Sequence, residues 1–255
     1  MVQKMSEKKS DGSVLLVSNN GKKFLVKDTE KDYHSQYGMI KKEDLMKNNG
    51  SELKTNKDVS LFLIKPSFID LFSKIKRGAQ IIPSKDVGFI ISETGIGKNS
   101  IVVDAGAGSG GLCLVLANIA KKVYSFDIRE DHIEIVKKNK ELLGLKNLEI
   151  KEGNIYQDKL PKNIDVVTLD VPEPWLAIEN VMKYLSSGGF IVSYSPTIPQ
   201  VSDLVDSVSN RKGIVHLKTI EIIEREWEIL GRKVRPKTQQ RISHSGFLTF
   251  LRKIN

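Results

Sequence analysis

The pattern of apolar and polar positions divides the chain into two unequal regions. Residues 1–12 are polar and predict a loose tail, and the stretches SVLLVS and KKFLVKD that follow are short and rich in β-forming residues. Asn20-Gly21 between these stretches is a strong hairpin signal. The chain therefore begins with a predicted small β-rich module, residues 1–70, whose boundary falls within the stretch 57–77.

From Ile101 onward, apolar runs of strand length alternate with segments of helical periodicity. The runs IVVDAG, KVYSFD, LEIKEGN and NIDVVTLD predict four strands, FIVSYS a fifth, and the segments 218–230 and 244–253 a final antiparallel pair. Helices are expected at 110–121, 130–144, 174–189 and 198–213. This alternation is typical of an α/β domain with a mostly parallel sheet, assigned to residues 71–255.

The amino-acid composition limits the cellular location and the class of protein, but it does not identify a ligand. Forty Lys and Arg residues against thirty-one Asp and Glu give a net charge of +9, which suits a protein that meets a polyanion and equally suits a Lys-rich solubilising surface. The chain lacks an apolar run of roughly 20 residues, so we expect a cytoplasmic protein without a membrane segment. Cys113 is the only cysteine, which excludes an intrachain disulfide, and no metal is expected.

A glycine-rich loop, DAGAGSG, begins at Asp104 between a predicted strand and a predicted helix. Its spacing fits both NAD and S-adenosylmethionine, and a tight turn without a ligand is a third reading. Asp104 favours S-adenosylmethionine, because a carboxylate attracts the cationic methionine end and repels a pyrophosphate. The candidate cofactor residues of this loop are Asp104, Gly106, Gly108, Ser109, Gly110, Gly111 and Leu112.

The next two strands also end in polar side chains. Asp127 is placed where a carboxylate can accept hydrogen bonds from both ribose hydroxyls, although it also suits the start of the following helix. Asn154 can accept a hydrogen bond from the adenine N6 and donate one to N1. Ile128 and Ile155, which follow these residues, are included in the cofactor site.

The fourth strand ends in DVPEPW, which begins at Asp170. This position at the carboxyl edge, next to the first strand, is where methyl donor and acceptor must meet. We therefore expect Asp170 to contact the cofactor and to act in catalysis. Pro172 and Trp175 would form a slot for a flat base, with core packing as the alternative for Trp175.

Seven segments, in this order, resemble the tRNA (adenine-58-N1) methyltransferases of the archaeal and bacterial homotetrameric type. They are His34-x-x-x-Gly38, Arg77-x-x-Gln80-Ile-x-x-x-Lys85-Asp86, DAGAGSGGL, DVPEPW, Tyr194-Ser-Pro-x-x-x-Gln200-Val, Arg235-Pro236 and His244-Ser245-Gly246-Phe247. The resemblance implies a β-barrel-like N-terminal module and a Rossmann-like, seven-stranded S-adenosylmethionine-dependent methyltransferase domain. It also implies a homotetramer that methylates N1 of adenine 58 in the T-loop of tRNA.

Within this resemblance, Gln80 is assigned to the cofactor site, and Arg235 and His244 to the substrate. Two positions depart from the family pattern. Pro83 stands where relatives often have Tyr or His, which leaves the target base open, and Asn154 replaces the usual acid, which bears on cofactor affinity.

Methyl transfer from a sulfonium mainly requires in-line placement of an unprotonated nitrogen, so we expect positioning residues and no nucleophile. Asp170 is predicted to accept a hydrogen bond from the exocyclic amine of adenine and to stabilise the charge that develops on the ring. His132 is expected on a helix surface and Cys113 in the core. The basic residues expected to hold RNA while the base is flipped are Lys74, Lys76, Arg77, Arg232, Lys233, Arg235, Lys237 and Arg241.

Three rival functions remain. An NAD-dependent oxidoreductase is supported by the glycine spacing and Asp127, but a convincing Tyr-x-x-x-Lys constellation is lacking. A non-catalytic RNA-binding module fits the charge of +9 but leaves the cofactor loop unexplained. Precorrin-type methyltransferases share the core plan, yet they explain neither the N-terminal module nor the basic C-terminal segment.

Overall fold

The computed structural model describes residues 12–237 and 244–255. Arg241 and nearly all of the predicted N-terminal tail lie outside these ranges. The chain forms two compact units, Met1–Ile75 and Lys76–Asn255. Each unit is built on its own sheet.

The N-terminal unit is built on a four-stranded antiparallel sheet in the order β2-β1-β6-β5. Its elements are β1 (Val14–Ser18), β2 (Lys23–Val26), the pair β3 (Tyr33–Ser35) and β4 (Gly38–Ile40), α1 (Lys42–Leu45), β5 (Glu52–Lys54), β6 (Ser60–Ile64) and α2 (Phe68–Phe72). The hairpin predicted at Asn20-Gly21 is confirmed, since β1 and β2 pair across it and Gly21 has a φ of 79°. Leu16, Leu53 and Leu61 are among the buried residues that close one face of this sheet.

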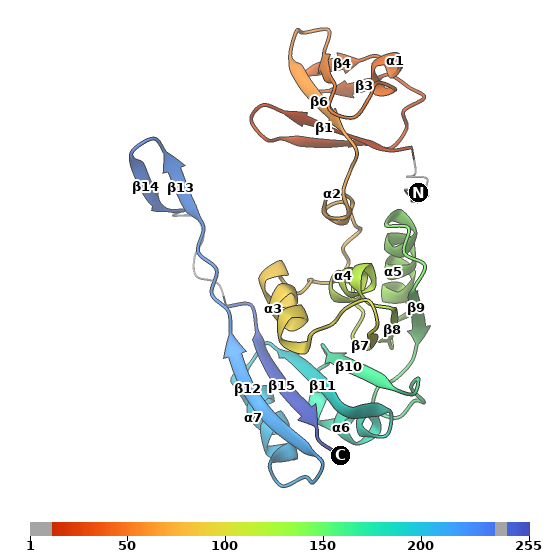
Figure 1. The fold of residues 1–255 in the computed structure, drawn as a ribbon, viewed down its shortest axis with the longest axis vertical. Coiled ribbons are helices and arrows are strands. Elements are labelled where there is room, and N and C mark those ends of the chain that lie inside the picture. The colour runs from red at the N-terminus through yellow and green to blue at the C-terminus, as the bar shows by residue number, and fades with distance from the viewer. Residues whose placement is uncertain (1–11, 238–243) are drawn as a thin grey trace, which may run out of the picture. The chain divides into compact units, whose positions relative to one another are not determined.

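The second unit holds a seven-stranded sheet in the order β12-β15-β11-β10-β7-β8-β9 (Figure 1). Its strands are β7 (Ile101–Ala105), β8 (Lys122–Asp127), β9 (Leu148–Glu152), β10 (Ile164–Leu169), β11 (Leu185–Ser195), β12 (Ile214–Glu221) and β15 (Phe247–Lys253). Of these, β15 runs antiparallel to its neighbours β11 and β12, and the other pairs are parallel. The predicted α/β class with a mostly parallel sheet is confirmed.

In the described part of the second unit, five helices accompany this sheet: α3 (Ser84–Thr94), α4 (Gly111–Ile119), α5 (Glu130–Leu142), α6 (Pro174–Met182) and α7 (Ile198–Ser209). Figure 1 shows α4 and α5 on one face and α6 and α7 on the other. The helices bury their apolar stripes, as Ile133 and Val136 of α5 illustrate. Among the described residues, no helix is long and apolar enough to cross a membrane.

The predicted boundary at Gly188-Gly189 is wrong. We expected a helix up to residue 189, but α6 ends at Met182 and β11 already begins at Leu185. The register with β10 jumps from Ile164↔Leu185 to Val166↔Phe190, so the glycines lie in a bulge within the strand. A glycine pair is compatible with a helix end and with a bulge, and only the pairing with β10 distinguishes the two.

The single β segment predicted at 218–230 is also wrong in its bounds. The sheet strand β12 ends at Glu221, and a separate hairpin is formed by β13 (Trp227–Leu230) and β14 (Lys233–Pro236). Leu230 pairs with Lys233, which leaves Gly231-Arg232 as a two-residue turn, and Gly231 has the positive φ that such turns require.

Candidate active site

A cavity of about 320 Å³ opens at the carboxyl ends of β7, β8, β9 and β10. The chain order reverses between β7 and β10, and ligands of open α/β sheets bind at such a switch point. The volume lies within the ~300–1,000 Å³ typical of small-molecule sites. The predicted site residues that line the cavity are Gln80, Asp104, Gly106, Gly108, Ser109, Gly111, Leu112, Asp127, Ile128, Asn154, Ile155, Asp170 and Pro172.

Gly106 shows why the loop after β7 needs glycine. Its φ is 90°, and a Cβ atom added there would lie 2.0 Å from the backbone oxygen of Asp170. The end of β10 therefore passes directly against the backbone of the loop. Gly106 also donates a backbone hydrogen bond of 2.9 Å to Phe126 O at the end of β8, so this residue joins three strand ends around the cavity.

Asp104, near the end of β7, is buried, and each oxygen of its carboxylate accepts a hydrogen bond from a hydroxyl group. Its carboxylate accepts hydrogen bonds from Ser125 Oγ at 2.8 Å and from Thr168 Oγ1 at 2.7 Å. Burial raises the pKa of Asp104 to about 6, although the two hydroxyl donors oppose this shift. The carboxylate thus ties β7 to β8 and β10 and contributes negative charge to one wall of the cavity.

Asp170, directly after β10, is also enclosed but has no such partners. Among the described residues, no side chain or backbone group donates a hydrogen bond to its carboxylate. Burial, together with the negative charges of Asp104 and Asp127, raises the pKa of Asp170 to about 7. The carboxylate of Asp170, which lines the cavity at this strand end, can therefore accept a hydrogen bond from a ligand.

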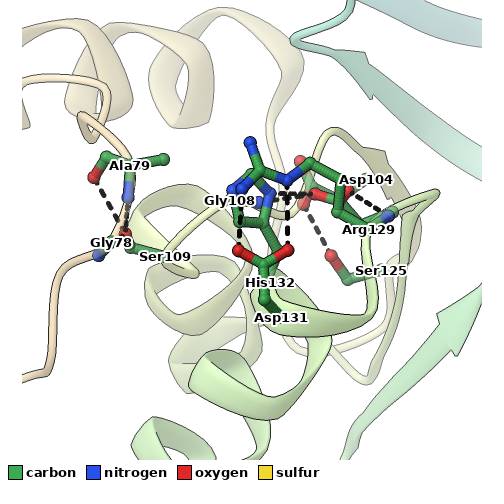
Figure 2. A network of polar contacts seen from close by, with 10 residues as sticks. Gly78, Ala79, Asp104, Gly108, Ser109, Ser125, Arg129, Asp131 and His132 are labelled. Carbon is green, nitrogen blue, oxygen red and sulfur yellow. Dashed lines mark hydrogen bonds and ion pairs between the residues drawn. The ribbon is translucent and has the colours of Figure 1, made fainter.

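Asp127 ends β8 and accepts three hydrogen bonds. Its Oδ2 atom accepts one from Gly108 N at 2.9 Å and lies 3.0 Å from His132 Nδ1, and its Oδ1 atom accepts one from Arg129 N at 3.0 Å. Figure 2 shows His132 reaching from α5 toward Gly108 and the glycine loop. The surface position predicted for His132 is wrong, because its side chain is only 13% exposed and lines the cavity.

Ser109 uses its hydroxyl to hold the segment that carries Gln80 over the glycine loop. The Oγ atom accepts hydrogen bonds from Gly78 N and Ala79 N, each at 2.9 Å, and donates one to Ala79 O at 2.8 Å (Figure 2). Asn139 of α5, which we did not predict, supports the same segment by donating to Lys76 O and to Ser109 O. The helical periodicity of the sequence does not mark Asn139 as a site residue. Its importance is visible only in the structure, where it is 2% exposed.

Asn154 lines the cavity, but part of its hydrogen-bonding capacity is used within its own turn. Its Oδ1 atom accepts a hydrogen bond from Tyr156 N at 3.0 Å, and its backbone N–H donates to Asp158 Oδ2 at 2.7 Å. The Nδ2 group has no partner among the described residues. The amide can therefore still donate to a ligand, while its carbonyl is already shared.

Four predicted site residues do not line this cavity. Gly110 caps α4 with a φ of 85°, and an added Cβ would lie 2.8 Å from Leu114 Cδ1. Trp175 packs against the core from α6. Arg235 pairs with Glu228 across the β13–β14 hairpin. The ring of His244, in the C-terminal motif, lies between Glu221 Oε1 and Pro196 O.

A partly buried polar cluster, which we did not predict as part of the site, lies where α3, β11 and β15 meet. Lys85 Nζ donates to Ser245 Oγ at 2.6 Å and to the fully buried Asp86, and Ser245 Oγ also donates to Asp86 Oδ2 at 3.0 Å. The Tyr194 hydroxyl donates to Ser245 O, and burial with the nearby charge of Asp86 raises the pKa of Tyr194 to about 12. This cluster fixes the start of β15 next to the end of β11.

The electrostatics of the cavity favour a cation. Asp104, Asp127 and Asp170 converge from three neighbouring strand ends, and their mutual repulsion contributes to the raised pKa values of Asp104 and Asp170. The guanidinium of Arg129, which also lines the cavity, is held by Asp131 at 2.7 Å (Figure 2). A ligand with positive charge at the inner end would relieve this repulsion.

Comparison with known proteins identifies relatives over nearly the whole chain. The tRNA (adenine(57)-N(1)/adenine(58)-N(1))-methyltransferase TrmI of Methanocaldococcus jannaschii is 34% identical, over 93% of this chain and 94% of the relative. Two solved structures are similar in fold and sequence. A SAM-dependent O-methyltransferase from Thermotoga maritima has a TM-score of 0.85 at 27% identity, covering 100% of this chain and 98% of that one. The tRNA (m1A58) methyltransferase TrmI from Aquifex aeolicus has a TM-score of 0.80 at 28% identity, covering 97% and 99%.

A family model described as tRNA methyltransferase complex GCD14 subunit matches residues 61–245. The match includes the glycine loop, the Asp170 segment and the polar cluster around Lys85. The fold, the cavity and the relatives agree, and the family predicted from the seven sequence segments is confirmed. This chain belongs to the GCD14 family of tRNA methyltransferases.

Proposed function

We propose that this protein transfers a methyl group from S-adenosylmethionine to N1 of adenine 58 in the T-loop of tRNA. The observation that carries the proposal is the carboxylate of Asp170, which is enclosed at the switch point of the sheet without a hydrogen-bond donor among the described residues. The names of the relatives from Methanocaldococcus jannaschii and Aquifex aeolicus specify the same chemistry.

The cavity suits S-adenosylmethionine better than NAD. When bound, S-adenosylmethionine supplies an electrophilic methyl group on a sulfonium, and it also carries an ammonium group. Asp104 and Asp170 place negative charge where these cations would lie, whereas the pyrophosphate of NAD would be repelled. We assign Asp127 to the ribose and Asn154 to the adenine through its free Nδ2 group. The other residues that we assign to the cofactor are Gln80, Gly106, Gly108, Ser109, Gly111, Leu112, Ile128 and Ile155.

Asp170 acts on the acceptor base in this proposal. Its carboxylate accepts a hydrogen bond from the exocyclic amine of adenine and so aims N1 toward the methyl group. The same carboxylate stabilises the positive charge that develops on the ring as the bond to N1 forms. Pro172 stiffens the loop beside Asp170, and Gln200 Nε2 holds this loop by donating to Pro172 O at 3.0 Å.

We also propose that the protein acts in the cytoplasm. Basic side chains outside the cavity hold the tRNA backbone in this proposal. Among the predicted contacts, Arg235 and Lys237 form ion pairs with Glu228 and Glu226. To bind a phosphate group of the tRNA, Arg235 and Lys237 would have to break these ion pairs within the protein. We propose residues 1–70 as an accessory domain for the methyltransferase domain of residues 71–255.

A homotetramer remains part of the proposal, and the β13–β14 hairpin supports an assembly. One face of this hairpin carries Trp227 and Ile229, which pair with Pro236 and Val234 on the neighbouring strand. Trp227 is 53% exposed and Ile229 is 69% exposed. A two-stranded hairpin is marginally stable on its own, so a second copy that covers this face would stabilise it. Sedimentation of the wild type at the mass of one 28.6 kDa chain would contradict the tetramer.

The methylation itself is tested with labelled S-adenosylmethionine and an unmodified tRNA transcript, followed by mapping of reverse-transcription stops. We expect a stop at adenine 58 and almost no label in a transcript with guanine at that position, because guanine N1 carries a hydrogen and its O6 is an acceptor facing Asp170. A transcript altered at position 57 separates methylation of the two neighbouring sites. Equal labelling of the guanine-58 transcript would overturn the assigned target.

A further inference from the structure

The ring of His244 makes two hydrogen bonds that a neutral imidazole cannot make together. Its Nδ1 atom lies 2.7 Å from Glu221 Oε1, and its Nε2 atom lies 2.8 Å from Pro196 O. An ionised carboxylate and a backbone carbonyl only accept hydrogen bonds, so each ring nitrogen has to donate one. A neutral imidazole carries one N–H group, whereas the imidazolium carries two. The geometry therefore requires a positively charged His244.

The surroundings of His244 support this charge. Among the described residues, the charged groups that act on the ring are Glu221 from β12 and Lys85 from α3. Glu221 and the carbonyl of Pro196 raise the pKa of His244, and the positive charge of Lys85 opposes this shift. The ammonium group of Lys85 is itself paired with Asp86 at 2.9 Å. Glu221 is therefore the partner that keeps the second proton on the ring.

The hydrogen bonds of His244 join three neighbouring strands of the sheet. In Figure 1, β12 and β11 lie on either side of β15. His244 lies just before β15, Glu221 ends β12, and Pro196 directly follows β11. The next residue after His244 is also tied to β11, because the hydroxyl of Tyr194 donates to Ser245 O. The turn at which the chain leaves β11 is thus held from two consecutive residues before β15.

This turn is connected to the loop that carries the proposed catalytic acid. Pro196 is followed by Thr197, whose Oγ1 atom donates to Gln200 Oε1 on α7 at 2.8 Å. Gln200 Nε2 in turn donates to Pro172 O at 3.0 Å, close to Asp170 in the chain. A displacement of Pro196 would therefore move the group that anchors the Asp170 loop. In methyl transfer, a shift of about 1 Å between the reacting groups can cost about 100-fold in rate.

We propose that His244 is a positioning residue for methyl transfer. As an imidazolium, it bridges Glu221 and Pro196 and so holds the Asp170 loop in the geometry that the reaction needs. Its ring does not line the cavity, so this role needs no contact with the base. It differs from the direct substrate contact that the family resemblance implies for His244. The role rests on the proposed function, in which Asp170 acts on the acceptor adenine.

The bridge should break when His244 loses its second proton. The Glu221 carboxylate holds the remaining proton on Nδ1, because a hydrogen bond to a charged acceptor is stronger than one to a carbonyl. Nε2 then presents a lone pair to Pro196 O, and the two atoms repel each other. The rate of methyl transfer should therefore fall as the pH rises through the pKa of His244, which lies above the ordinary value of about 6.5.

Two substitutions separate the charge of the ring from its hydrogen bond to Pro196. Glu221→Gln supplies an amide whose NH₂ group can donate to Nδ1, so a neutral ring can keep its proton on Nε2 and still donate to Pro196 O. His244→Ala removes both hydrogen bonds at every pH. His216→Ala, which changes an exposed histidine of β12 that does not line the cavity, is the matched control.

The first measurement is single-turnover methylation of an unmodified tRNA transcript from about pH 6 to about pH 9. The wild type and His216→Ala should become slower at the alkaline end, and Glu221→Gln should lack this fall. We expect His244→Ala to be slower than the wild type by roughly 10- to 100-fold near neutral pH. The affinities of His244→Ala for S-adenosylhomocysteine and for tRNA should change little, because His244 contacts neither ligand in this proposal.

A direct contact between His244 and a tRNA phosphate would give a different result. His244→Ala would then bind tRNA more weakly, with a smaller salt dependence, and would keep the wild-type rate at saturating tRNA. That outcome would overturn the positioning role. An alkaline fall in Glu221→Gln equal to that of the wild type would overturn it as well.

The charge of the ring is measured separately, by NMR titration of protein with labelled histidine, in which His244→Ala identifies the signal. We expect His244 to titrate above about pH 6.5 in the wild type and at lower pH in Glu221→Gln. A ring that is already neutral at about pH 6 would overturn the bridge, whether or not the protein methylates tRNA. If the ring titrated as expected but the wild type labelled no transcript, the proposed function would fail, and the positioning role with it.

Discussion

The ends of β7 and β10 are neighbours in the sheet, and each places an acid beside the same cavity. Asp104 on β7 accepts hydrogen bonds from Ser125 and Thr168, whereas Asp170 after β10 has no donor among the described residues. Burial raises both pKa values, to about 6 and about 7. The two acids thus have different roles: Asp104 joins three strands, and Asp170 is left for a ligand. Four experiments test this distinction.

The largest effect is expected for Asp170→Ala in methyl transfer. The loss of one preorganised group that acts on developing charge lowers the rate by roughly 10²- to 10³-fold. Single-turnover methylation of a tRNA transcript measures this step, and titration with S-adenosylhomocysteine should show a smaller change. Asp203→Asn on the exposed surface of α7 serves as the control. Normal turnover in Asp170→Ala would remove this residue from the chemistry.

Asp104→Ala should act mainly on stability. Its removal leaves the hydroxyls of Ser125 and Thr168 buried without an acceptor, which destabilises the fold by about 1–3 kcal/mol. Urea denaturation measures the free energy of unfolding. Adding Ser125→Ala and Thr168→Val should recover part of the loss, because the stranded donors are then absent. A destabilisation that the added substitutions do not relieve would argue against the hydroxyl contacts as its cause.

The raised pKa of Asp170 predicts a pH dependence of activity. A protonated Asp170 is a poorer acceptor for the amine of adenine, so kcat/KM should fall about tenfold per pH unit below pH 7. A bound cationic cofactor lowers the pKa of Asp170, and the profile of kcat should therefore move to lower pH. The profiles are measured with one transcript over a series of buffers at constant ionic strength. A flat kcat/KM between about pH 6 and about pH 8 would contradict the assignment.

The fourth prediction concerns the effect of Asp170→Asn on stability. Because the pKa of Asp170 is about 7 in the folded protein and about 3.9 in an unfolded chain, the folded wild type retains a proton over that window and loses stability as the pH rises through it. The Asp170→Asn variant has no carboxyl group at this position, so its stability should not fall in this way as the pH rises. It should be more stable than the wild type by up to about 4 kcal/mol above pH 7, because the two pKa values differ by about three units, and the difference should disappear below about pH 4. Thermal unfolding at both pH values tests the sign, and a lower stability of Asp170→Asn at high pH would reverse it.

Several features of this protein follow from the sequence alone. Apolar runs that alternate with helical segments predict parallel strands, and the carboxyl ends of parallel strands share one edge of the sheet. Asp104, Asp127 and Asp170 follow such runs, so their meeting at one cavity is a consequence of local pattern and strand direction. Asn20-Gly21 determines its hairpin in the same local way.

Only the tertiary structure decided which atoms of these residues remain free. The two carbonyls held by Asn139 and the bulge at Gly188-Gly189 each depend on a partner far along the chain or on another strand. In the sequence, Asp104 and Asp170 look alike, because each is an acid that follows an apolar run. In the structure they differ, because the hydroxyls of Ser125 and Thr168 donate hydrogen bonds to Asp104. Periodicity specifies which face of an element is buried, but the hydrogen-bond partners on that face are set by long-range packing.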